Sequence, residues 1–567
     1  MSVSASPASH HAAFRMPRSL DVVALLQALC AMVWLPQAAV LAYAVSRLQQ
    51  GSGFQSVILP AVFIVALGAV RAVIEAWAST RLHDGARACL VQWRQQAVSV
   101  LAGQSPLDRN RIAAGAAAGV LGEQAEAIMP WLTRYRTASW RARIMPLVIL
   151  IPVVWLSWAC ALVLMVAAPL IPMFMAIVGW RAKAASEAQW LKLGDMNAFL
   201  LDRLRGLPTL RAFGGVRLTA QRLRASAEDL RQRTMRVLRI AFLSSAVLEL
   251  FSALGVALVA VYIGFHLLGQ LDFGAWGHQL TLAEGLFILL LSPAFFEPLR
   301  ELAAVWHDKA SGQAAVEALE NLARGGMPVV CGGGTITSVL PADTGPCVRV
   351  RSLAFGFPDE RPLFTGLDLS IQPGEKIALV GPSGAGKTVV LSLLAGLLPP
   401  QSGVIEIGDQ TLETGSGDAI RARIGWMGQR PHVFAGSVAS NVALASNAVD
   451  LSVIAQATSS AGLEPVAQAH PSVLLGEGGV GLSGGEAARL ALARLLAASG
   501  KDLWLVDEPT AHLDSATASL IRQALLDHSG RRTLVVATHD PALIARMDRV
   551  ITVGDASAVV LQGGSNV

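Results

Sequence analysis

Long apolar runs fill most of the first half of the chain. Crossing a bilayer core of ~30 Å takes ~20 helical residues, and six runs approach or exceed that length: about 21–46, 55–79, 143–160, 161–180, 238–268 and 281–305. We separate the third run from the fourth at residues 157–160, because the stretch 144–180 is too long for one crossing. The pattern predicts an all-α membrane domain with six spans over residues 1–320.

A different pattern begins near Val348. Short β-branched runs, separated by turns that contain Gly and Pro, alternate from there with helical segments. This alternation is typical of an α/β domain with a largely parallel sheet, so we predict such a domain over residues 348–567. The glycines and prolines within residues 321–347 indicate the linker between the two domains.

Composition and charge favour a membrane protein over a nucleic-acid-binding one. Of the 567 residues, 53% are apolar and 15% are charged, which is too few charges for an ordinary soluble protein. Residues 1–330 carry 29 Lys and Arg against 19 Asp and Glu, whereas residues 331–567 carry 16 against 21. The basic excess therefore falls in the gaps between apolar runs, where it orients a membrane protein, and no nucleic acid is expected as a partner.

The arginines also predict the orientation in the membrane. They gather in two gaps of about sixty residues, 80–142 and 181–237, while the turn 269–281 contains neither Lys nor Arg. Basic loops stay in the cytoplasm, so both gaps and both termini are expected there. The gaps have helical patterns, so the helices beside them should continue below the membrane as antiparallel hairpins. No small-residue cleavage site follows a short apolar core near the N-terminus, so we expect no cleaved leader.

Several ionisable residues interrupt the predicted spans. They are Arg71, Glu75, Glu249, Glu284, Glu297, Arg300 and Glu301. Each costs about 2.5–3.5 kcal/mol if it faces lipid at mid-bilayer, so we expect these side chains to face protein or a water-filled path. Arg71 and Glu75 are one helical turn apart and can neutralise one another. For Glu297 and Arg300, beside Pro298, a role in lining a cargo path and snorkelling to the inner interface both stay open.

The five cysteines, at positions 30, 89, 160, 331 and 347, form no Cys-x-x-Cys pair and no even set. Neither a structural zinc site nor a disulfide framework is therefore indicated. We expect the cysteines to be small buried apolar side chains.

A phosphate-binding loop follows the predicted strand 377–380. Residues 381–388 read Gly-Pro-Ser-Gly-Ala-Gly-Lys-Thr and precede an apolar helix, which is the GxxxxGK[ST] motif in its required strand, loop and helix context. Such a loop turns successive N–H groups and a helix N-terminus toward phosphate oxygens. Lys387 adds positive charge at the β- and γ-phosphates, and Thr388 offers a hydroxyl to magnesium. The predicted nucleotide contacts in this loop are Gly381, Ser383, Gly384, Gly386, Lys387 and Thr388.

Two further segments carry candidate chemistry. The apolar strand 503–506 ends in Asp507 and Glu508, of which the first is placed to hold a metal ion and the second to polarise a water for attack on the γ-phosphate. Before a helix at 487–498, Ser483, Gly484 and Gly485 expose N–H groups that suit an anion. Because the chain already has a phosphate-binding loop, this second loop is predicted to contact a nucleotide held by a neighbouring subunit.

In this order, these elements resemble an ABC-type ATPase domain. The resemblance implies that Gln429 contacts magnesium and the attacking water, that His539 contacts the γ-phosphate, and that Asp514 lies in a loop at a dimer interface. Phe357 falls where the family stacks an aromatic ring on adenine. Glu486 replaces the frequent Gln of the family's signature. The implied cofactors are ATP and Mg²⁺, with metal ligands Thr388, Gln429 and Asp507 and catalytic residues Glu508, His539 and Gln429.

Six spans with long cytoplasmic hairpins, ahead of one such domain, resemble an ABC exporter half-transporter. Four runs are more specifically similar to the CydD branch of the heterodimeric CydDC exporters: residues 168–176, 199–206, 231–239 and 292–300. This resemblance implies a homologous CydC-like half-transporter as partner and a location in the bacterial inner membrane. It also implies coupling segments near 115–126 and 203–211 that pass movements of the ATPase domains to the membrane helices.

The implied cargo is a small thiol. Glutathione or cysteine would move from the cytoplasm to the periplasm, in support of cytochrome bd assembly. Two alternatives stay open. A haem transporter or haem-loading subunit would use His266, His278 or His307 as ligands, although each is more readily explained as an interfacial or solvated residue. A lipid or drug exporter would need a more uniformly apolar cavity than the charges of the sixth span indicate.

Overall fold

The computed structural model describes most of the chain, and the described residues fall into two units. The described ranges are 17–51, 53–112, 114–170, 206–324, 326–330, 344–358, 360–413, 415–444, 450–469, 482–554 and 557–561, with isolated positions or short pieces between 173 and 204 and residue 475. The first unit is Met1–Val98 with Ala113–Arg324, and the second is Ser99–Ile112 with Gly325–Val567.

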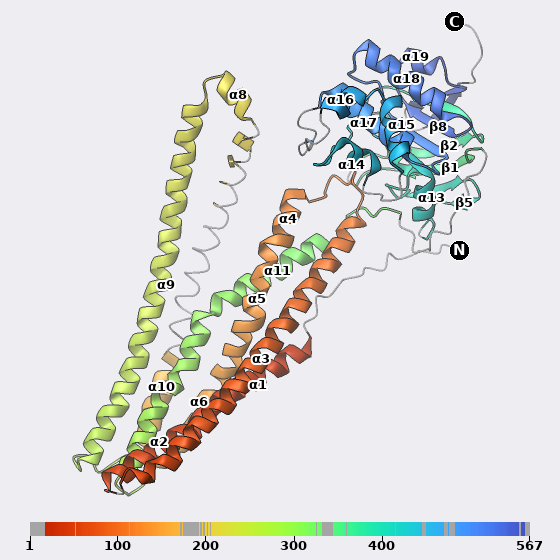
Figure 1. The fold of residues 1–567 in the computed structure, drawn as a ribbon. Coiled ribbons are helices and arrows are strands. Elements are labelled where there is room, and N and C mark those ends of the chain that lie inside the picture. The colour runs from red at the N-terminus through yellow and green to blue at the C-terminus, as the bar shows by residue number, and fades with distance from the viewer. Residues whose placement is uncertain are drawn as a thin grey trace. The chain divides into compact units, whose positions relative to one another are not determined.

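The first unit is built from helices in the part of the chain that the structure describes (Figure 1). They are α1 (Arg18–Cys30), α2 (Trp34–Gln49), α3 (Gln55–Ala102), α4 (Ala114–Gly122), α5 (Ile128–Pro130), α6 (Arg136–Leu156), a helix at Trp158–Leu170, α8 (Leu207–Ala212), α9 (Val216–Leu267), α10 (Leu282–Ala304) and α11 (Trp306–Ala323). Single 3₁₀ or π turns link several of them, at Ala31–Val33, Gln124–Ala127 and Trp131–Tyr135.

Five helical stretches among the described residues are long and apolar enough to cross a membrane. They are Arg18–Gln49, Gln55–Ala102, Ala114–Leu156, Glu249–Leu267 and Leu282–Ala323. The predicted break between the third and fourth spans is confirmed, because α6 ends at Leu156 and Ser157 has extended backbone, with φ −153° and ψ 112°. The fourth predicted span is described only as the helix Trp158–Leu170, and its remainder lies outside the described residues.

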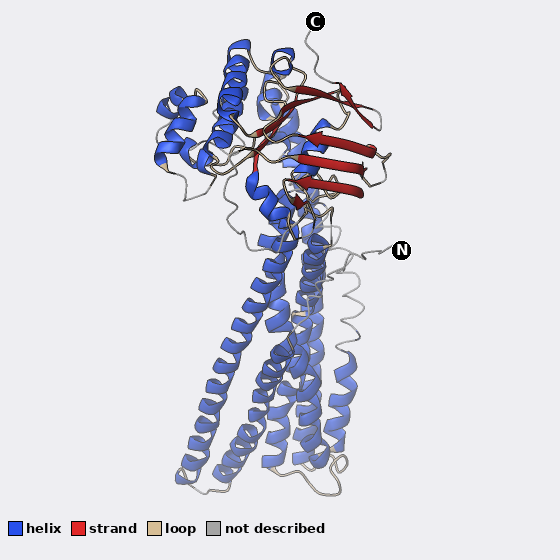
Figure 2. Ribbon diagram, turned by 90° about the vertical axis from the view of Figure 1, so that its right-hand side faces the viewer, coloured by secondary structure: helices blue, strands red, loops and turns tan. Residues whose placement is uncertain are grey.

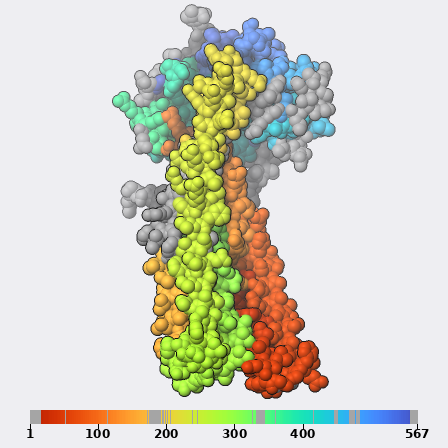
Figure 3. Space-filling view, turned by 90° about the vertical axis from the view of Figure 1, so that its left-hand side faces the viewer, coloured from red at the N-terminus to blue at the C-terminus, as the bar shows by residue number. Residues whose placement is uncertain are grey.

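Two helices are much longer than a bilayer is thick. α3 has 48 residues and α9 has 52, which correspond to about 72 Å and 78 Å at ~1.5 Å per residue. Both exceed the ~30 Å core, so the predicted continuation of the spans beyond the membrane is confirmed. Figure 3 shows α9 as a continuous yellow to yellow-green column along one face of the helical unit. Its exposed apolar side chains include Phe242, Leu250 and Val261, as is typical of a helix surrounded by lipid or other helices.

The core of the helical unit lies around α10. This helix packs against α2, α6 and α9, and its Phe295 and Phe296 are buried and meet edge to face, with ring centroids 5.1 Å apart. Gly255 of α9 gives the Phe296 ring its space, because a Cβ at residue 255 would lie 2.6 Å from the ring. Glu284, one of the ionisable residues of the sixth predicted span, closes a capping box with Thr281 at the start of α10. Its carboxylate thus stabilises the end of a helix.

The cysteines largely match the prediction. Cys30, Cys89 and Cys160 are buried, and Cys347 is half-buried. Cys331 lies outside the described residues.

The described residues of the second unit form two sheets, drawn in red in Figure 2. The four-stranded antiparallel sheet has the order β2-β1-β4-β5, and the six-stranded sheet has the order β10-β9-β3-β8-β7-β6. The strands are β1 (Val348–Phe355), β2 (Phe364–Ile371), β3 (Lys376–Val380), β4 (Ser402–Ile407), β5 (Gln410–Thr411), β6 (Ile424–Met427), β7 (Leu503–Asp507), β8 (Thr533–Ala537), β9 (Arg549–Gly554) and β10 (Ser557–Leu561). In the six-stranded sheet only β10 pairs antiparallel.

Helices cover the six-stranded sheet, and its central strands are buried on both sides. The described helices of this unit are α12 (Lys387–Leu394), α13 (Gly417–Arg423), α14 (Val438–Ala443), α15 (Leu451–Ser460), α16 (Glu464–Ala469), α17 (Gly484–Ala497), α18 (Ser515–Ser529) and α19 (Pro541–Ile544). Of these, α12 and α17 contact strands of the sheet, whereas α14, α15 and α16 pack on α17 or on one another. In β7, Leu503 and Leu505 belong to one hydrophobic core, while Trp504 and Val506 belong to the other. A parallel strand buried on both faces has a continuous apolar sequence, which explains why the run 503–506 contains no polar residue.

Gly255 allows a packing test with a matched control on the same helix. We expect Gly255→Ala to lower the thermal unfolding temperature of the detergent-solubilised protein, because overpacking against Phe296 costs about 1–3 kcal/mol. A Cβ at Gly264 of α9 would have no heavy atom within 4 Å, so Gly264→Ala should be neutral or stabilise the helix by up to about 1 kcal/mol. Equal unfolding temperatures for the two variants would contradict this packing.

Candidate functional site

Three loops leave the same edge of the six-stranded sheet. β3, β8 and β7 are parallel neighbours, so the residues that follow them meet at the carboxyl ends of the strands. The phosphate-binding loop begins after Val380, Asp507 ends β7 and is followed by Glu508, and His539 follows β8. The sheet therefore brings together residues that are more than 150 positions apart in the sequence.

The phosphate-binding loop needs glycine at its close approaches. Gly386 is the N-cap of α12 and has a left-handed φ of 92°, and a Cβ there would lie 2.7 Å from both Leu363 and Phe364. A Cβ at Gly381 would lie 2.2 Å from the carbonyl oxygen of Val553. A side chain at either position would have to displace neighbouring groups. The loop thus keeps its N–H groups and the start of α12 available for an anion.

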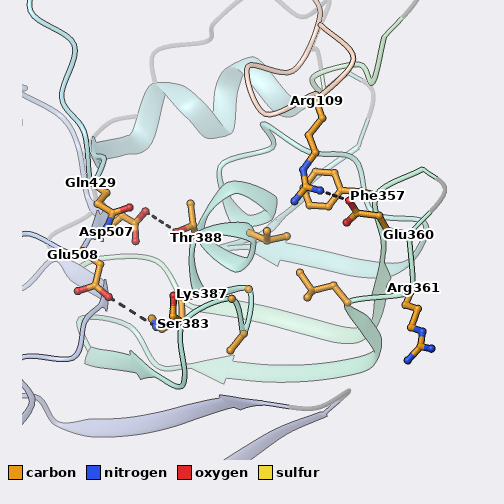
Figure 4. Close-up of a pocket in the computed structure, with 15 residues that line it drawn as sticks. Arg109, Phe357, Glu360, Arg361, Ser383, Lys387, Thr388, Gln429, Asp507 and Glu508 are labelled. Carbon is orange, nitrogen blue, oxygen red and sulfur yellow. Dashed lines mark hydrogen bonds and ion pairs between the residues drawn. The ribbon is translucent and has the colours of Figure 1, made fainter. Parts of the chain in front are cut away.

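Lys387 and Thr388 connect this loop to the two carboxylates (Figure 4). Lys387 Nζ donates to the carbonyl of Gly381 at 2.8 Å and lies 3.9 Å from Glu508 Oε1. Thr388 Oγ1 donates to Asp507 Oδ2 at 2.8 Å. The ammonium, the hydroxyl and both carboxylates therefore share one small volume, as the strand and loop pattern predicts.

Asp507 has the features of a magnesium ligand. It is buried, and its Oδ1 accepts no hydrogen bond from the described part of the chain. Burial raises the pKa of Asp507 above the ordinary Asp range, against the lowering effect of the hydrogen bond from Thr388. A buried carboxylate oxygen without a donor, next to a hydroxyl, fits Mg²⁺, which prefers oxygen ligands. The residues present are therefore compatible with the metal that the sequence predicts.

Glu508 and His539 lie against one another. His539 Nδ1 is 2.7 Å from Glu508 Oε2, and the imidazole is exposed while the carboxylate is largely buried. Glu508 has a left-handed φ of 46°, yet its N–H still donates to the carbonyl of Ala537 in β8. Such a backbone costs about 1–3 kcal/mol in a non-glycine residue and is concentrated at functional sites. The turn directs the Glu508 side chain toward Lys387 and His539.

A cavity of about 370 Å³ adjoins these residues. Its lining includes the predicted residues Phe357, Ser383, Gly384, Gly386, Lys387, Thr388, Gln429, Asp507 and Glu508. Arg109, Glu360 and Arg361 also line it, and sequence reasoning missed them. Arg109 precedes the other lining residues by about 250 positions, and no motif of the sequence connects it with them.

The second predicted anion loop lies outside the lining of this cavity. Ser483 is the N-cap of α17, and it forms a capping box in which Glu486 accepts from the Ser483 N–H at 2.7 Å. Gly484 and Gly485 form the first turn of the helix, so their N–H groups lie at its positive end. Asp514 caps α18 by accepting from the N–H groups of Ala516 and Thr517, and the hydrogen bonding of Thr517 lowers the pKa of Asp514.

An ion pair fixes the loop that carries His539. Asp540 accepts from Arg522 Nη1 at 2.8 Å and from Thr510 Oγ1 at 2.9 Å, and it caps α19. Burial alone would raise the pKa of Asp540, but these hydrogen bonds outweigh burial and the pKa is lowered. The segment around Thr510 and the segment around His539 are thus joined through one carboxylate.

The helical unit contains a separate charged group, which we name the Arg141 cluster: Arg71, Glu75, Arg141 and Glu301. Arg141 Nη2 donates to Glu75 at 2.8 Å, and Arg141 Nη1 lies 3.5 Å from Glu301. Arg71 lies 3.7 Å from Glu75, so the predicted pairing of these two residues is confirmed. The cluster joins α3, α6 and α10 and balances two positive charges with two negative ones.

Family models match both units of the chain. The model described as the ABC transporter transmembrane region matches residues 22–288, the ABC transporter model matches 364–511, and a model for an AAA domain matches 484–545. The solved structure of a bacterial Atm1-family ABC exporter with ATP bound is similar in fold, with a TM-score of 0.76 and 20% sequence identity. That match covers 95% of this chain and 94% of the other. The predicted fold class, a helical exporter membrane domain followed by an α/β ATPase domain, is confirmed, and the chain is a membrane ATPase.

Two curated relatives extend over most of the chain. The Transport ATP-binding protein AarD of Providencia stuartii is 39% identical over 75% of this chain and 72% of the relative. The Glutathione/L-cysteine transport system ATP-binding/permease protein CydD of Haemophilus influenzae is 36% identical over 81% of this chain and 77% of the relative.

Asp507→Asn separates metal binding from folding. The folded-state pKa of Asp507 lies above its unfolded-state value. Burial of the ionised carboxylate therefore lowers the free energy of unfolding of the wild type. This loss of stability is absent at acid pH and grows as pH rises through the folded-state pKa. At neutral pH we expect Asp507→Asn to unfold at a temperature no lower than the wild type without nucleotide, but to lose the extra stabilisation by Mg²⁺ with ATP. Thermal unfolding with and without Mg²⁺ measures both effects. A variant that Mg²⁺ with ATP still stabilises as strongly as the wild type would contradict the assignment.

Proposed function

The chain belongs to the CydD family of ABC transporters, and from this membership we propose that it is one half of an exporter of glutathione or cysteine. The observation that carries the proposal is the 36% identity, over 81% of the chain, to a CydD protein named for glutathione and cysteine transport. Export would run from the cytoplasm to the periplasm of a bacterial inner membrane, in support of cytochrome bd assembly. The ATPase domain and both termini would then be cytoplasmic, with domains at 1–320 and 348–567 joined by a linker at 321–347.

The residues at the carboxyl ends of β3, β7 and β8 supply the chemistry of ATP hydrolysis. Glu508 takes a proton from a water as the water oxygen attacks the γ-phosphorus, and the bond to the β–γ bridging oxygen breaks to give ADP and phosphate. Lys387 and the N–H groups of the phosphate-binding loop stabilise the phosphate charge, and His539 contacts the γ-phosphate. Thr388, Asp507 and Gln429 would hold Mg²⁺, which neutralises charge on the phosphate oxygens.

The proposed partner is a homologous CydC-like half-transporter. Ser483, Gly484 and Gly485 do not line the cavity that contains Lys387, while their helix N-terminus suits an anion. A nucleotide held between the phosphate-binding loop of one subunit and the Ser-Gly-Gly turn of the other uses both sites. Phe357 would stack on its adenine, and Asp514 would lie at the shared interface.

ATP binding would drive the transport step. Closure of two ATPase domains over two nucleotides draws the cytoplasmic ends of the long helices together and turns the membrane cavity outward, and hydrolysis resets it. Coupling segments near 115–126 and 203–211 belong to the first unit. The segment Ser99–Ile112 belongs to the second unit, so we assign it a part in coupling that the sequence did not predict.

The Arg141 cluster supports a charged cargo over a lipid or a drug. Glutathione and cysteine carry both carboxylate and ammonium groups, which would exchange partners with the arginines and glutamates that pair within this cluster. Glu75 lies about 30 Å along α3 from Gln55, near the inner interface in the proposed orientation, where a cytoplasmic cargo enters. For haem, His266 is a poor ligand, because it is buried and accepts from the N–H of Leu280.

Glu508→Gln tests the hydrolysis step. The amide keeps the size of the side chain but cannot take the proton, so we expect ATP turnover at this site to fall by at least about 100-fold while ATP still binds. ATPase activity of the reconstituted heterodimer, measured beside ATP binding, separates the two effects. Turnover at this site that survives the substitution would remove Glu508 from the role of base.

Uptake into inverted membrane vesicles tests the cargo. We expect ATP-dependent accumulation of labelled glutathione and cysteine by the heterodimer, and none by the Glu508→Gln form if the partner's site cannot drive transport alone.

Arg141→Gln should reduce thiol uptake about tenfold or more while ATP binding persists, because it leaves Glu75 and Glu301 without their shared cation. Arg324→Gln is the control and should leave uptake unchanged, since Arg324 lies outside the predicted spans and is an exposed arginine 3.7 Å from Glu320. Uptake of haem with no uptake of thiols would overturn the thiol proposal.

A further inference from the structure

The Arg109 side chain lies over the Phe357 ring, which lines the nucleotide cavity. Its guanidinium carbon lies 4.8 Å from the centroid of the Phe357 ring, and its Nη1 forms an ion pair with Glu360 (Figure 4). All three side chains line the same cavity as Lys387. Phe357 also meets Phe355 of the core edge to face, with centroids 5.2 Å apart. The ring is thus held by the core on one side and covered by a cation in the cavity.

The segment that carries Arg109 is fastened to the second unit by its backbone. Gly103 and Ser105 pair with Val329 and Met327, through hydrogen bonds of 2.8 Å in each direction. Asp108 accepts from the N–H of Met327, also at 2.8 Å. These contacts fix the turn that begins where α3 ends, at Ala102.

Val330, which follows the residues that pair with the Arg109 segment, also contacts the C-terminal end of α12, the phosphate-binding helix. The Val330 N–H donates to the carbonyl of Gly396 at 2.9 Å, and Arg421 Nη1 donates to the Val330 carbonyl at 2.6 Å. Gly396 follows α12, the helix that begins with Lys387. Arg109 is therefore connected through backbone hydrogen bonds to the helix that binds phosphate.

We propose that Arg109 senses the nucleotide base: its guanidinium covers the Phe357 ring, and adenine that stacks on this ring displaces it. The inference rests on the proposed nucleotide site. A guanidinium over the ring and a stacked base use the same π-surface, so both cannot hold it at once. The Arg109 side chain is 66% exposed, which leaves room for it to swing away. The segment that carries Arg109 directly follows α3. Displacement of Arg109 by the base would therefore transmit nucleotide binding to this membrane helix.

Competition at the ring predicts tighter ATP binding without Arg109. Exposed cation–π contacts correspond to roughly a two- to five-fold change in an equilibrium constant. We expect Arg109→Ala to bind ATP about two- to five-fold more tightly than its parent, and to bind inorganic tripolyphosphate, which has no base, with unchanged affinity. Arg361→Ala is the matched control, because it removes the same charge from the same cavity lining. Its affinity for ATP should not increase.

The measurements use the full heterodimer in lipid nanodiscs, in a Glu508→Gln background so that ATP is retained. The partner's own site is identical in every sample and cancels in the comparison. Hydrogen exchange of residues 103–112 gives a second readout, and we expect ATP to speed exchange there while tripolyphosphate does not. Thermal unfolding of Arg109→Ala should match that of its parent, since the side chain is exposed.

The outcomes separate the two proposals. ATP binding by Arg109→Ala that is unchanged or weaker, or an equal change for tripolyphosphate, overturns the sensing role and leaves the nucleotide site intact. If the parent heterodimer binds neither ATP nor tripolyphosphate through Lys387, as judged with Lys387→Ala, the nucleotide site itself is wrong and the inference falls with it.

Discussion

The parallel pairing of β3, β8 and β7 is the constraint on which the nucleotide site depends. Ala537 of β8 pairs with Leu379 on one side and with Asp507 on the other, so its position fixes where two of the three loops begin. A register slip of one residue would turn the Asp507 side chain to the opposite face of the sheet. Thr388 would then lose its acceptor, and Glu508 would leave the vicinity of Lys387. The apolar packing on both faces of β7 holds this register.

Residues whose chemistry follows directly from a strand could be predicted from the sequence. The phosphate-binding loop and the Asp507-Glu508 pair each follow an apolar run, and carboxyl ends of parallel strands share one edge. Arg109 could not be predicted in this way. Its contact with Glu360 spans 251 positions, and it depends on the pairing of residues 103–105 with 327–329, which have no periodic pattern. Sequence reasoning therefore found the phosphate end of the cavity and missed part of its base end.

In the helical unit, the hydrophobicity of the sequence predicted where the spans lie but not which charged side chains meet between the helices. The break at Ser157 followed from the length of the run, because one crossing has a limited length. Arg141 was assigned to the basic gap before the third span, yet α6 begins at Arg136, so this arginine lies inside a helix and meets two carboxylates. An apolar scan places the start of a helix late when its first turns are polar. The partners of Arg141 come from α3 and α10, and their approach depends on how the helices pack.

The structure also explains how Glu486 fits a position where Gln is frequent. A capping box accepts either side chain at its third helical position, because the acceptor oxygen is all that the Ser483 N–H requires. Glu486 makes that bond and also accepts from the Ser483 hydroxyl at 2.9 Å. The positive end of α17 stabilises the negative carboxylate of Glu486. The same carboxylate repels a phosphate that approaches this end of the helix. Glutamate thus preserves the fold of the turn and reduces its attraction for an anion, which makes this half of a shared site electrostatically weaker than one built with glutamine.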